Sequence, residues 1–234
     1  EVRLGRPVLI AHMDPQGRRL ETRLWRRKGP FSSDRLRPYS ERFVHATAAL
    51  RRLGVEAPVV CASGRVGAGM RFVTYEPVAG RSLREIGASV DRAALARFVL
   101  ELHDLGVYCR GLNLGNLIQL PDGRFGLADV AQTRFKAGPL SRRQRERNLG
   151  ILCSHPQDLG VLAGGPWSEL VMAYCRAAGV SLAAAAQMRE RVRLQVERRN
   201  ARRAVAAASS APASAGARAG VDPTAAAEAA LPRS

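Results

Sequence analysis

The segment Gly106–Val130, GVYCRGLNLGNLIQLPDGRFGLADV, contains the pattern that decides the expected fold of this chain. Leu117–Leu120 and Arg124–Asp129 are rich in the apolar and aromatic residues that are typical of strands. Asp122 and Gly123 lie between them, and an Asp-Gly pair flanked by two such runs is a strong signal for a β-hairpin. We therefore expect a hairpin whose turn is centred on Asp122 and Gly123.

The register of this hairpin is expected to bring two oxygen-bearing side chains together. A turn centred on Asp122 and Gly123 places Asn116 directly opposite Asp129. The Cβ atoms of directly opposite residues lie about 4.5–5.5 Å apart. One amide oxygen and one carboxylate at that separation can share a hard cation with phosphate oxygens, as Mg²⁺ requires. The sequence therefore predicts a metal site at Asn116 and Asp129.

The segments before the hairpin predict a small β-rich region with one helix. Apolar and β-branched runs favour strands, and apolar residues at helical spacing favour a helix that ends near a glycine. The predicted strands are Val8–Ala11, Leu20–Trp25, Pro58–Ser63 and Met70–Tyr75, and the predicted helix is Pro38–Leu53. A basic loop, Arg26–Pro30, is expected before this helix, with helix caps among Ser32, Ser33 and Asp34.

The segments after Glu76 predict a larger and mainly helical region. Pro77 and Gly80 break regular structure, and helical periodicity returns after them. The predicted helices are Val90–Leu105 with Asp91 as its cap, Ser141–Ser154, Trp167–Ala177 and Ala183–Ala208. Alanine, serine, proline and glycine dominate the last residues, a composition typical of disorder. The expected organisation is an N-lobe (1–76), a helical C-lobe (77–208), a disordered tail (209–234) and a ligand cleft between the lobes.

The positive charge of the chain favours polyanionic partners but does not identify one of them. The 234 residues carry a formal net charge of +17, and Lys28 and Lys136 are the only lysines. Such a balance favours nucleic acid, anionic lipid or phosphorylated sugars. No stretch reaches the roughly 18 consecutive apolar residues of a membrane span, and the first residues do not resemble a signal peptide. We therefore expect a cytoplasmic protein, with a piece missing before Glu1 because the chain does not begin with Met.

The cysteines predict neither a metal site nor a disulfide framework. Cys61, Cys109, Cys153 and Cys175 are widely spaced and form no Cys-x-x-Cys pair. We expect them to be small buried apolar residues.

Two motifs carry a resemblance to a known family. Cys109–Asn116, CRGLNLGN, is similar to the kinase catalytic loop His-Arg-Asp-Leu-x-x-x-Asn, and Asp129–Ala131 lies where Asp-Phe-Gly is expected. The pattern over Leu112–Asp129 resembles the lipopolysaccharide kinase family, especially its toluene-tolerance or InaA-like branch. The similarity extends from about Gly17 to Asp158.

The resemblance implies a bilobal, protein-kinase-like α+β fold with ATP and Mg²⁺ in the cleft. It also implies phosphoryl transfer to a sugar hydroxyl of the lipopolysaccharide inner core, with contact between the basic surface and the inner leaflet of the membrane as a further expectation. In such kinases catalysis is mostly positioning and charge neutralisation. The implied residues are Arg110, Asn116 and Asp129 for catalysis, Asn116 and Asp129 for Mg²⁺, Arg23 for the phosphates, Glu41 for orienting that cation, and Glu76 to Val78 as the hinge for adenine.

Three departures from the family motif bear on activity. Gly111 replaces the catalytic aspartate, Cys109 replaces the motif histidine, and Arg23 replaces the strand lysine. Losing a positioned base removes roughly 10²–10⁴ of rate, although a loose phosphoryl-transfer transition state depends less on proton removal. Gly5 and Gly17 are the only traces of a glycine-rich phosphate loop.

Two other functions remain open from the sequence. The first is a pseudokinase, which would act as a partner-binding scaffold in envelope or solvent stress. The second is a basic nucleic-acid-binding protein, although the low aromatic content of 5% and the lack of a recognisable motif disfavour it.

Structural roles are the alternative for each candidate residue. Asp129 could cap a turn, and Asn116 could stabilise one. Arg23 could be a plain outward-facing strand residue, and Glu41 could lie on a solvated helix face. His103 is expected to be a satisfied helix-end histidine rather than a substitute base.

Overall fold

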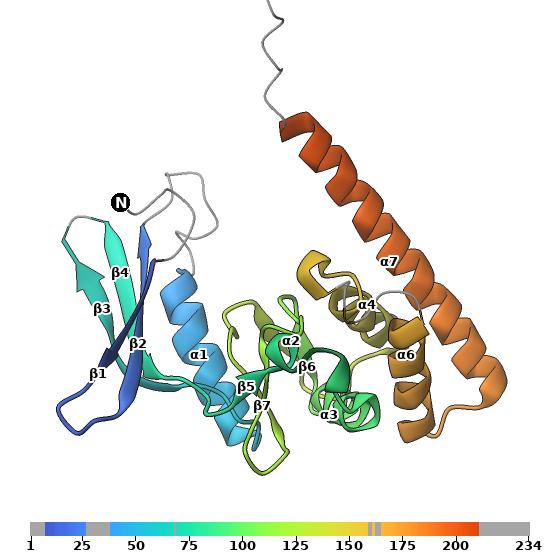
Figure 1. Cartoon of the computed structure of the whole chain (residues 1–234), viewed down its shortest axis with the longest axis horizontal. Helices are drawn as coiled ribbons and strands as arrows, with labels where there is room; N and C mark the ends of the chain where they lie inside the picture. Colours follow the sequence, from blue (N-terminus) through green and yellow to red (C-terminus); the bar gives the residue numbers. More distant parts are fainter. Residues whose placement is uncertain (1–7, 27–37, 68, 159–160, 162–164, 211–234) are drawn as a thin grey trace, which may run out of the picture. The chain divides into compact units, whose positions relative to one another are not determined.

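A computed structural model describes residues 8–26, 38–67, 69–158, 161 and 165–210 (Figure 1). The chain divides into two units, Glu1–Asn200 and Ala201–Ser234. The expected division at residue 76/77 falls at the end of a strand, inside the first unit. Gly5, the predicted basic loop beyond Arg26 with its caps, and the predicted tail beyond Ser210 lie outside the described residues.

The N-terminal part of the first unit is a four-stranded antiparallel sheet with one helix. The strands lie in the order β1-β2-β4-β3, and the helix α1 separates β2 from β3 in sequence. The bounds are β1 Val8–Met13, β2 Arg19–Arg26, α1 Tyr39–Arg52, β3 Val59–Val66 and β4 Met70–Glu76. The four predicted strands and the predicted helix are therefore confirmed.

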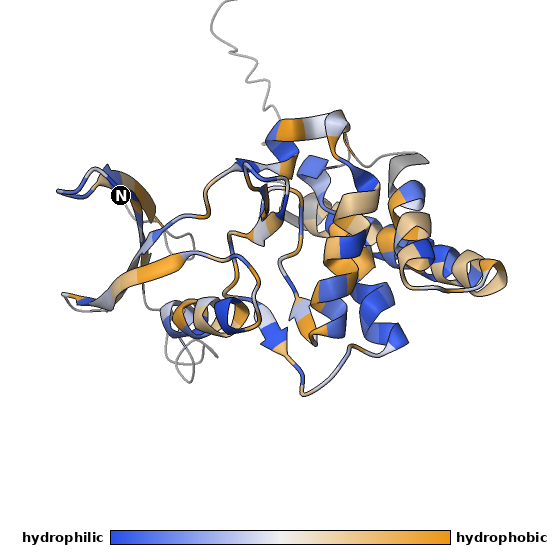
Figure 2. Ribbon diagram, turned by 90° about the horizontal axis from the view of Figure 1, so that it is seen from below, coloured by the Kyte–Doolittle hydropathy of each residue, from blue (hydrophilic) through white to orange (hydrophobic). Residues whose placement is uncertain are grey.

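Helix α1 packs on one face of this sheet because its apolar residues recur at helical spacing. Phe43 and Leu50 are fully buried, and the ring centroids of Phe43 and Tyr75 of β4 lie 5.0 Å apart. Figure 2, which views α1 close to its axis, shows both hydrophobic and hydrophilic residues on this helix. Leu53, the last residue of the predicted helix, lies just beyond the end of α1 at Arg52 and is 38% exposed.

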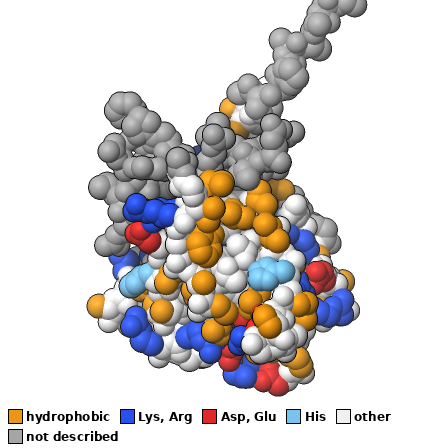
Figure 3. Space-filling model, turned by 90° about the vertical axis from the view of Figure 1, so that its left-hand side faces the viewer, with side chains coloured by type: hydrophobic (Ala, Val, Ile, Leu, Met, Phe, Trp, Pro, Cys, Tyr) orange, Lys and Arg blue, Asp and Glu red, His pale blue; other side chains and the backbone are white. Residues whose placement is uncertain are grey.

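Several large hydrophobic side chains of the sheet are exposed. Figure 3, which views the molecule from the side of this sheet, shows hydrophobic groups among basic ones. The exposed residues of the sheet are Leu9, Ile10, Met13, Val59 and Val66.

The C-terminal part of the first unit is mainly helical, as predicted. Asp91 caps α3 by accepting bonds from the backbone N–H groups of Ala93 and Ala94, and Leu95, Phe98, Val99 and Leu102 are buried on one face. The elements are β5 Arg81–Ser82, α2 Leu83–Ile86, η2 Gly87–Ser89, α3 Arg92–Asp104, β6 Val107–Cys109, β7 Leu117–Gln119, β8 Phe125–Leu127, β9 Thr133–Phe135, α4 Arg142–Leu152, η3 Pro156–Asp158, α6 Gly165–Ala177 and α7 Leu182–Ser210.

The predicted hairpin exists, but its predicted register is wrong by one residue. Strand β7 pairs with β8 so that Leu117 faces Leu127, and Ala128 N donates to Asn116 O at 2.9 Å. The cause is the turn: Gly123 has φ +83° and joins Pro121 and Asp122 in a three-residue loop, a common hairpin connection with a glycine in the left-handed region. Asn116 therefore faces Ala128, and Asp129 lies one residue beyond it.

Three of the four cysteines match their expected role. Cys109, Cys153 and Cys175 are buried, and burial raises the pKa of the Cys109 thiol to about 11. Cys61 of β3 is exposed, contrary to expectation. None of the described helices combines the length and the apolarity needed to cross a membrane.

Candidate active site

Arg23, Asp129 and Tyr39 form the contact that joins the sheet to the hairpin region. Arg23 Nη1 of β2 lies 3.3 Å from Asp129 Oδ2, and the Tyr39 hydroxyl of α1 donates to Asp129 Oδ1 at 2.9 Å. The Arg23 and Asp129 side chains are 16% and 30% exposed. Both carboxylate oxygens of Asp129 therefore have a partner from the N-terminal part of the chain.

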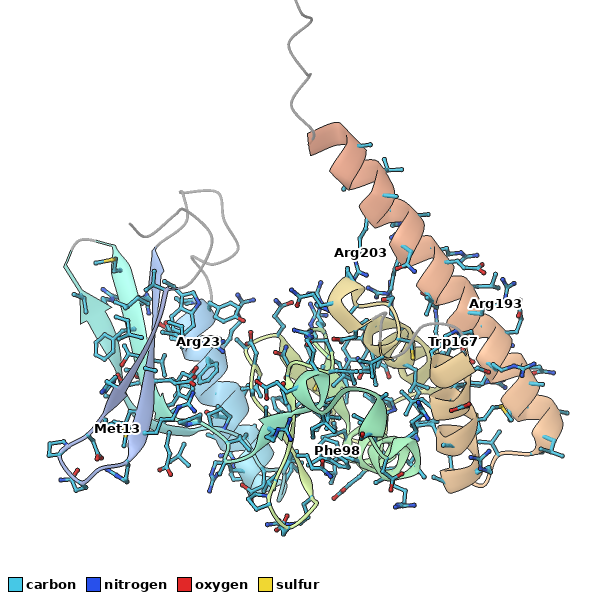
Figure 4. All side chains as sticks on the ribbon, in the orientation of Figure 1. Met13, Arg23, Phe98, Trp167, Arg193 and Arg203 are labelled. Atoms are coloured by element: carbon cyan, nitrogen blue, oxygen red, sulfur yellow. The ribbon has the colours of Figure 1, made fainter. Side chains whose placement is uncertain are left out.

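Strand alternation directs Arg23 toward α1. Successive side chains of a strand point to opposite faces, so Glu21, Arg23 and Trp25 share one face of β2. The guanidinium of Arg23 lies over the rings of Phe43 and Tyr75, 5.8 and 5.7 Å from their centroids, and Figure 4 labels its place beside α1. Arg23 is thus held between aromatic rings and an acid, which argues against the alternative of a plain outward-facing residue.

Electrostatic interactions keep Arg23 positively charged and Tyr39 neutral. Burial alone would lower the pKa of Arg23, but the Asp129 carboxylate and the surrounding tyrosines raise it. Burial, followed by the nearby Asp129 carboxylate, raises the pKa of Tyr39. Tyr39 therefore stays a hydrogen-bond donor and Arg23 stays a cation at any physiological pH.

A cavity of about 400 Å³ borders Arg23 and the chain that links the sheet to the helical part. Arg23 and Glu21 come from β2, Glu76 is the last residue of β4, and Pro77 and Val78 follow it. Ile118 of β7 and Ala128, the neighbour of Asp129, close it from the hairpin. The structure therefore brings together Arg23, Glu76 and Val78, three of the residues predicted to hold a nucleotide.

Glu21 and Tyr75 form a second pair in this cavity. The Tyr75 hydroxyl donates to Glu21 Oε2 at 2.9 Å, because the two residues are register partners on β2 and β4. Burial raises the pKa of Tyr75. The pair places an acid on the wall of the cavity that Arg23 also lines.

The loop that resembles the kinase catalytic loop is held by its asparagines. Asn116 Nδ2 donates to Gly111 O at 2.8 Å, and Asn113 Nδ2 donates to the same carbonyl at 2.9 Å. Asn113 Oδ1 accepts from the N–H of Gly115 at 2.9 Å. Because the Asn116 amide uses its nitrogen inside the loop, its oxygen Oδ1 is turned away from Gly111.

Gly111 has room for a side chain. A Cβ built there would meet one atom within 4 Å, Asn116 Nδ2 at 3.7 Å, which is an ordinary contact. Gly111 is also absent from the glycines with positive φ. The loop therefore keeps a backbone that an aspartate could adopt, although the sequence supplies none.

An ion pair between the partly exposed Arg84 and the buried Asp158 fixes the other side of this loop. Asp158 is 1% exposed; it accepts from Arg84 Nε and from the N–H of Leu114, both at 2.7 Å. Arg84 Nη2 also donates to Asn113 Oδ1 at 3.0 Å. Asp158 therefore connects α2 and η3 to the loop.

His103 is a satisfied buried histidine, as predicted. Its Nε2 donates to Asn148 Oδ1 at 3.1 Å, and its Nδ1 accepts from the Tyr174 hydroxyl at 2.9 Å. Asn148 Nδ2 in turn donates to Cys109 O at 2.6 Å. His103 therefore supports the loop through Asn148 and has the role of a structural histidine, not of a substitute base.

Two predicted site residues lie elsewhere. Glu41 of α1 forms an ion pair with Arg71 of β4 and is 58% exposed, so the structure does not bring it to Arg23; the solvated-face alternative describes it better. Helical periodicity cannot say which polar residue of a helix faces the site, and Tyr39, two residues earlier, fills that place. Arg110 is exposed and lines a different cavity.

Comparison with solved structures identifies the fold. The structure is similar to the aminoglycoside phosphotransferase APH(3'')-Id from Streptomyces rimosus ATCC10970 in complex with ADP and streptomycin, with a TM-score of 0.55, 14% sequence identity and coverage of 81% of this chain and 92% of that chain. This chain has a protein-kinase-like fold. It also matches the bifunctional kinase-methyltransferase WbdD at a TM-score of 0.47 and 15% identity; the match covers 76% of this chain and 45% of WbdD, less than half of its length. No protein-family model and no curated protein sequence matches the chain.

The oxygens near the kinase-like loop suit Mg²⁺. Mg²⁺ is usually held by one or two protein oxygens together with substrate phosphates and water. Asn116 Oδ1 and the Asp129 carboxylate are oxygens of that kind, and the cation Arg23 balances the charge of Asp129. No cluster of three or more His, Cys, Asp or Glu side chains that could hold a metal by itself occurs in the described part of the chain.

We predict that Asp158→Ala lowers the free energy of unfolding by about 3–5 kcal/mol, because it leaves Arg84 and the Leu114 N–H without their buried acceptor. Denaturant unfolding measures this. Asp122→Ala, in the exposed hairpin turn, is the matched control and should change stability far less. Equal effects of the two substitutions would contradict the role of Asp158.

We predict an acid-sensitive contribution from His103. Burial lowers its pKa from the ordinary value of 6.5 to about 4, so the unfolded chain binds the proton more readily between these values. Stability should therefore fall as pH drops from about 6.5 to 4, by about 3 kcal/mol from this group. Unfolding of the wild type and of His103→Gln across this range isolates the effect; parallel curves would contradict it.

Proposed function

We propose that the chain binds ATP with Mg²⁺ in the cavity beside Arg23 and transfers a phosphoryl group to a sugar hydroxyl of the lipopolysaccharide inner core, in the manner of the lipopolysaccharide kinases. The observation that carries the proposal is the Arg23–Asp129 ion pair of 3.3 Å beside a cavity bordered by Glu76 to Val78. It joins a phosphate-binding cation, a metal-binding acid and a linking segment in one place. In this proposal the protein is cytoplasmic, with its basic surface near the inner leaflet.

The proposed roles follow from the positions of the side chains. Backbone groups of Glu76 and Val78 bind the adenine, and Arg23 binds the phosphates as a forked donor. Asn116 Oδ1 and Asp129 hold Mg²⁺, which when bound neutralises phosphate charge. With Mg²⁺ bound, Asp129 would pair with the metal in place of Arg23. The Tyr39 hydroxyl would still donate to the other carboxylate oxygen of Asp129.

The class of acceptor rests on the fold and on the sequence resemblance. A protein of the same fold is an aminoglycoside phosphotransferase solved with ADP and streptomycin, which supports a small hydroxylated acceptor rather than a protein. The resemblance of Leu112–Asp129 to the lipopolysaccharide kinases supports the inner-core sugar as that acceptor.

A second candidate function is a pseudokinase scaffold. The observation that favours it is Gly111, which has no side chain to accept the acceptor's proton. The two candidates share the fold, but the scaffold would bind nucleotide weakly or not at all and would not turn it over.

We predict that saturating ATP with Mg²⁺ raises the melting temperature of the wild type by several degrees. A ligand at about 100 times its Kd stabilises by about 2.7 kcal/mol, and about 1 kcal/mol corresponds to roughly 2–4 °C for a chain of this size. Asp129→Ala should abolish the part of the shift that requires Mg²⁺. Differential scanning fluorimetry with and without EDTA measures it.

The control for this experiment is Asp122→Ala, which removes a carboxylate from the same hairpin outside the cavity. It should keep the wild-type shift. An Mg²⁺-dependent shift that survives in Asp129→Ala would contradict the proposed site.

We predict that Gly111→Asp increases phosphoryl transfer by about 10²-fold or more, because a positioned base contributes roughly 10²–10⁴ and the backbone accepts a Cβ there. Transfer from labelled ATP to core oligosaccharide measures it, with Asn116→Ala/Asp129→Ala as background. Gly111→Asn is the matched control of similar size without the base. Incorporation by the wild type at the background level, with none gained by Gly111→Asp, would end the enzyme proposal and leave the scaffold.

A further inference from the structure

A second cavity, of about 700 Å³, lies next to the kinase-like loop and is lined mainly by cations. None of its described lining residues also lines the nucleotide cavity. Five exposed basic residues face it, and Arg199 of α7 also borders it. The five are Arg110, Arg134, Lys136, Arg143 and Arg147. We call the cavity that they line the basic cavity.

Strand and helix periods explain why these residues converge. Strands β6 and β9 are antiparallel partners, with Tyr108 opposite Arg134. Because strand side chains alternate, Arg110 shares the face of Tyr108, and Lys136 shares the face of Arg134. On α4, Arg143 and Arg147 are four residues apart and form one stripe. Two independent elements therefore direct their cations into one space.

The charges in the basic cavity are not balanced by acidic side chains of the residues that the structure describes. No acidic side chain is among the described residues that line it, and none of its five cations takes part in an ion pair with another described residue. Their neighbours on the same helix behave differently: Arg142 pairs with Glu146 at 3.0 Å and Arg145 pairs with Asp104 at 2.7 Å. Among the described residues, Arg142 and Arg145 of α4 have acidic partners, whereas Arg143 and Arg147, which line the cavity, have none.

We infer that the basic cavity is a binding site for a compact ligand that carries two or more phosphate groups. Four guanidinium groups and one ammonium supply five positive charges, and a phosphate monoester carries about −1.5 to −2. Guanidinium groups bind phosphate bidentately. The first turn of α4, with Ser141 and Gln144 on the cavity wall, adds the positive end of a helix dipole.

The form of the site favours a small ligand over a polymer. A cavity of about 700 Å³ is within the 300–1,000 Å³ typical of small-molecule sites. A single-stranded nucleic acid is bound by aromatic platforms along a groove, and Tyr108 is the one aromatic side chain among the described lining residues. Arg110 directly precedes Gly111, so a ligand in this cavity lies beside the proposed phosphotransfer loop.

Isothermal titration with fructose 1,6-bisphosphate, at about 0.15 M NaCl and without Mg²⁺, tests the site. The wild type should bind this bisphosphate and should not bind fructose. Arg143→Glu/Arg147→Glu should raise the Kd by about tenfold or more, since it reverses two of the five charges. Arg176→Glu/Arg189→Glu makes the same change of net charge at exposed residues outside the cavity and should change the Kd less than about twofold.

Further arms separate the sources of phosphate. A single-stranded DNA oligonucleotide and vesicles containing anionic lipid should show weaker binding, and the two double variants should weaken it alike. Fructose 1,6-bisphosphate that fails to bind, or that binds both double variants equally, would overturn the inference. Vesicle or DNA binding that is lost only in Arg143→Glu/Arg147→Glu would overturn it in favour of a surface for that partner.

Crossed controls keep this inference separate from the nucleotide site. Asp129→Ala should retain bisphosphate binding and lose the Mg²⁺-dependent ATP shift, while Arg143→Glu/Arg147→Glu should do the reverse. The second result also shows that the charge-reversed protein is folded. An ATP shift lost only in the charge-reversed variant would overturn the nucleotide site and leave the anion site standing.

Discussion

The ion pair between Arg23 and Asp129 is the interaction on which the candidate active site depends. It pairs a cation of the sheet with an acid of the segment after β8, and both side chains are mostly withdrawn from solvent. Attraction between charges strengthens as water is excluded, and the Tyr39 hydroxyl holds the second carboxylate oxygen. The pair therefore holds the acid next to Arg23, which lines the cavity that Glu76 to Val78 border. When a nucleotide binds with its metal, the phosphates would pair with Arg23 and the metal would pair with Asp129.

The kinase-like loop keeps its shape without its usual base. Asp158 holds it through Arg84 and the Leu114 N–H, and Asn148 holds Cys109 O. The contacts to the Leu114 N–H and to Cys109 O use the backbone of the loop, and none of these contacts involves position 111. The loss of the aspartate is therefore a local chemical change in an otherwise supported loop, and this is why both an enzyme and a scaffold fit the same structure.

The sequence predicted the elements better than the contacts between them. The helices containing Phe43 and Phe98 and the hairpin at Asp122 and Gly123 follow from periodicity and turn composition, which are local properties. The register failed because Gly123 adopts positive φ and adds a residue to the turn, a choice that the dipeptide alone does not determine.

The site was predicted in part for the same reason. Motif spacing led to Arg23, Asn116 and Asp129. Sequence reasoning assigned no role to Tyr39 or Asp158, because their partners lie 90 and 44 residues away. Tyr39 directly follows Pro38 at the expected start of a helix, and that position was the one available signal. The sequence did not predict the basic cavity, because Arg110 and Arg147 line one cavity only after β6, β9 and α4 have packed.

A double-mutant cycle on Arg23 and Asp129 tests the central claim most directly. The free energies of unfolding of the wild type, Arg23→Ala, Asp129→Ala and the double variant give the coupling between the two side chains. The structure predicts a favourable coupling of about 1 kcal/mol or more. Effects that add within about 0.3–0.5 kcal/mol, the level expected of independent sites, would show that the two groups do not meet and would contradict the proposed site.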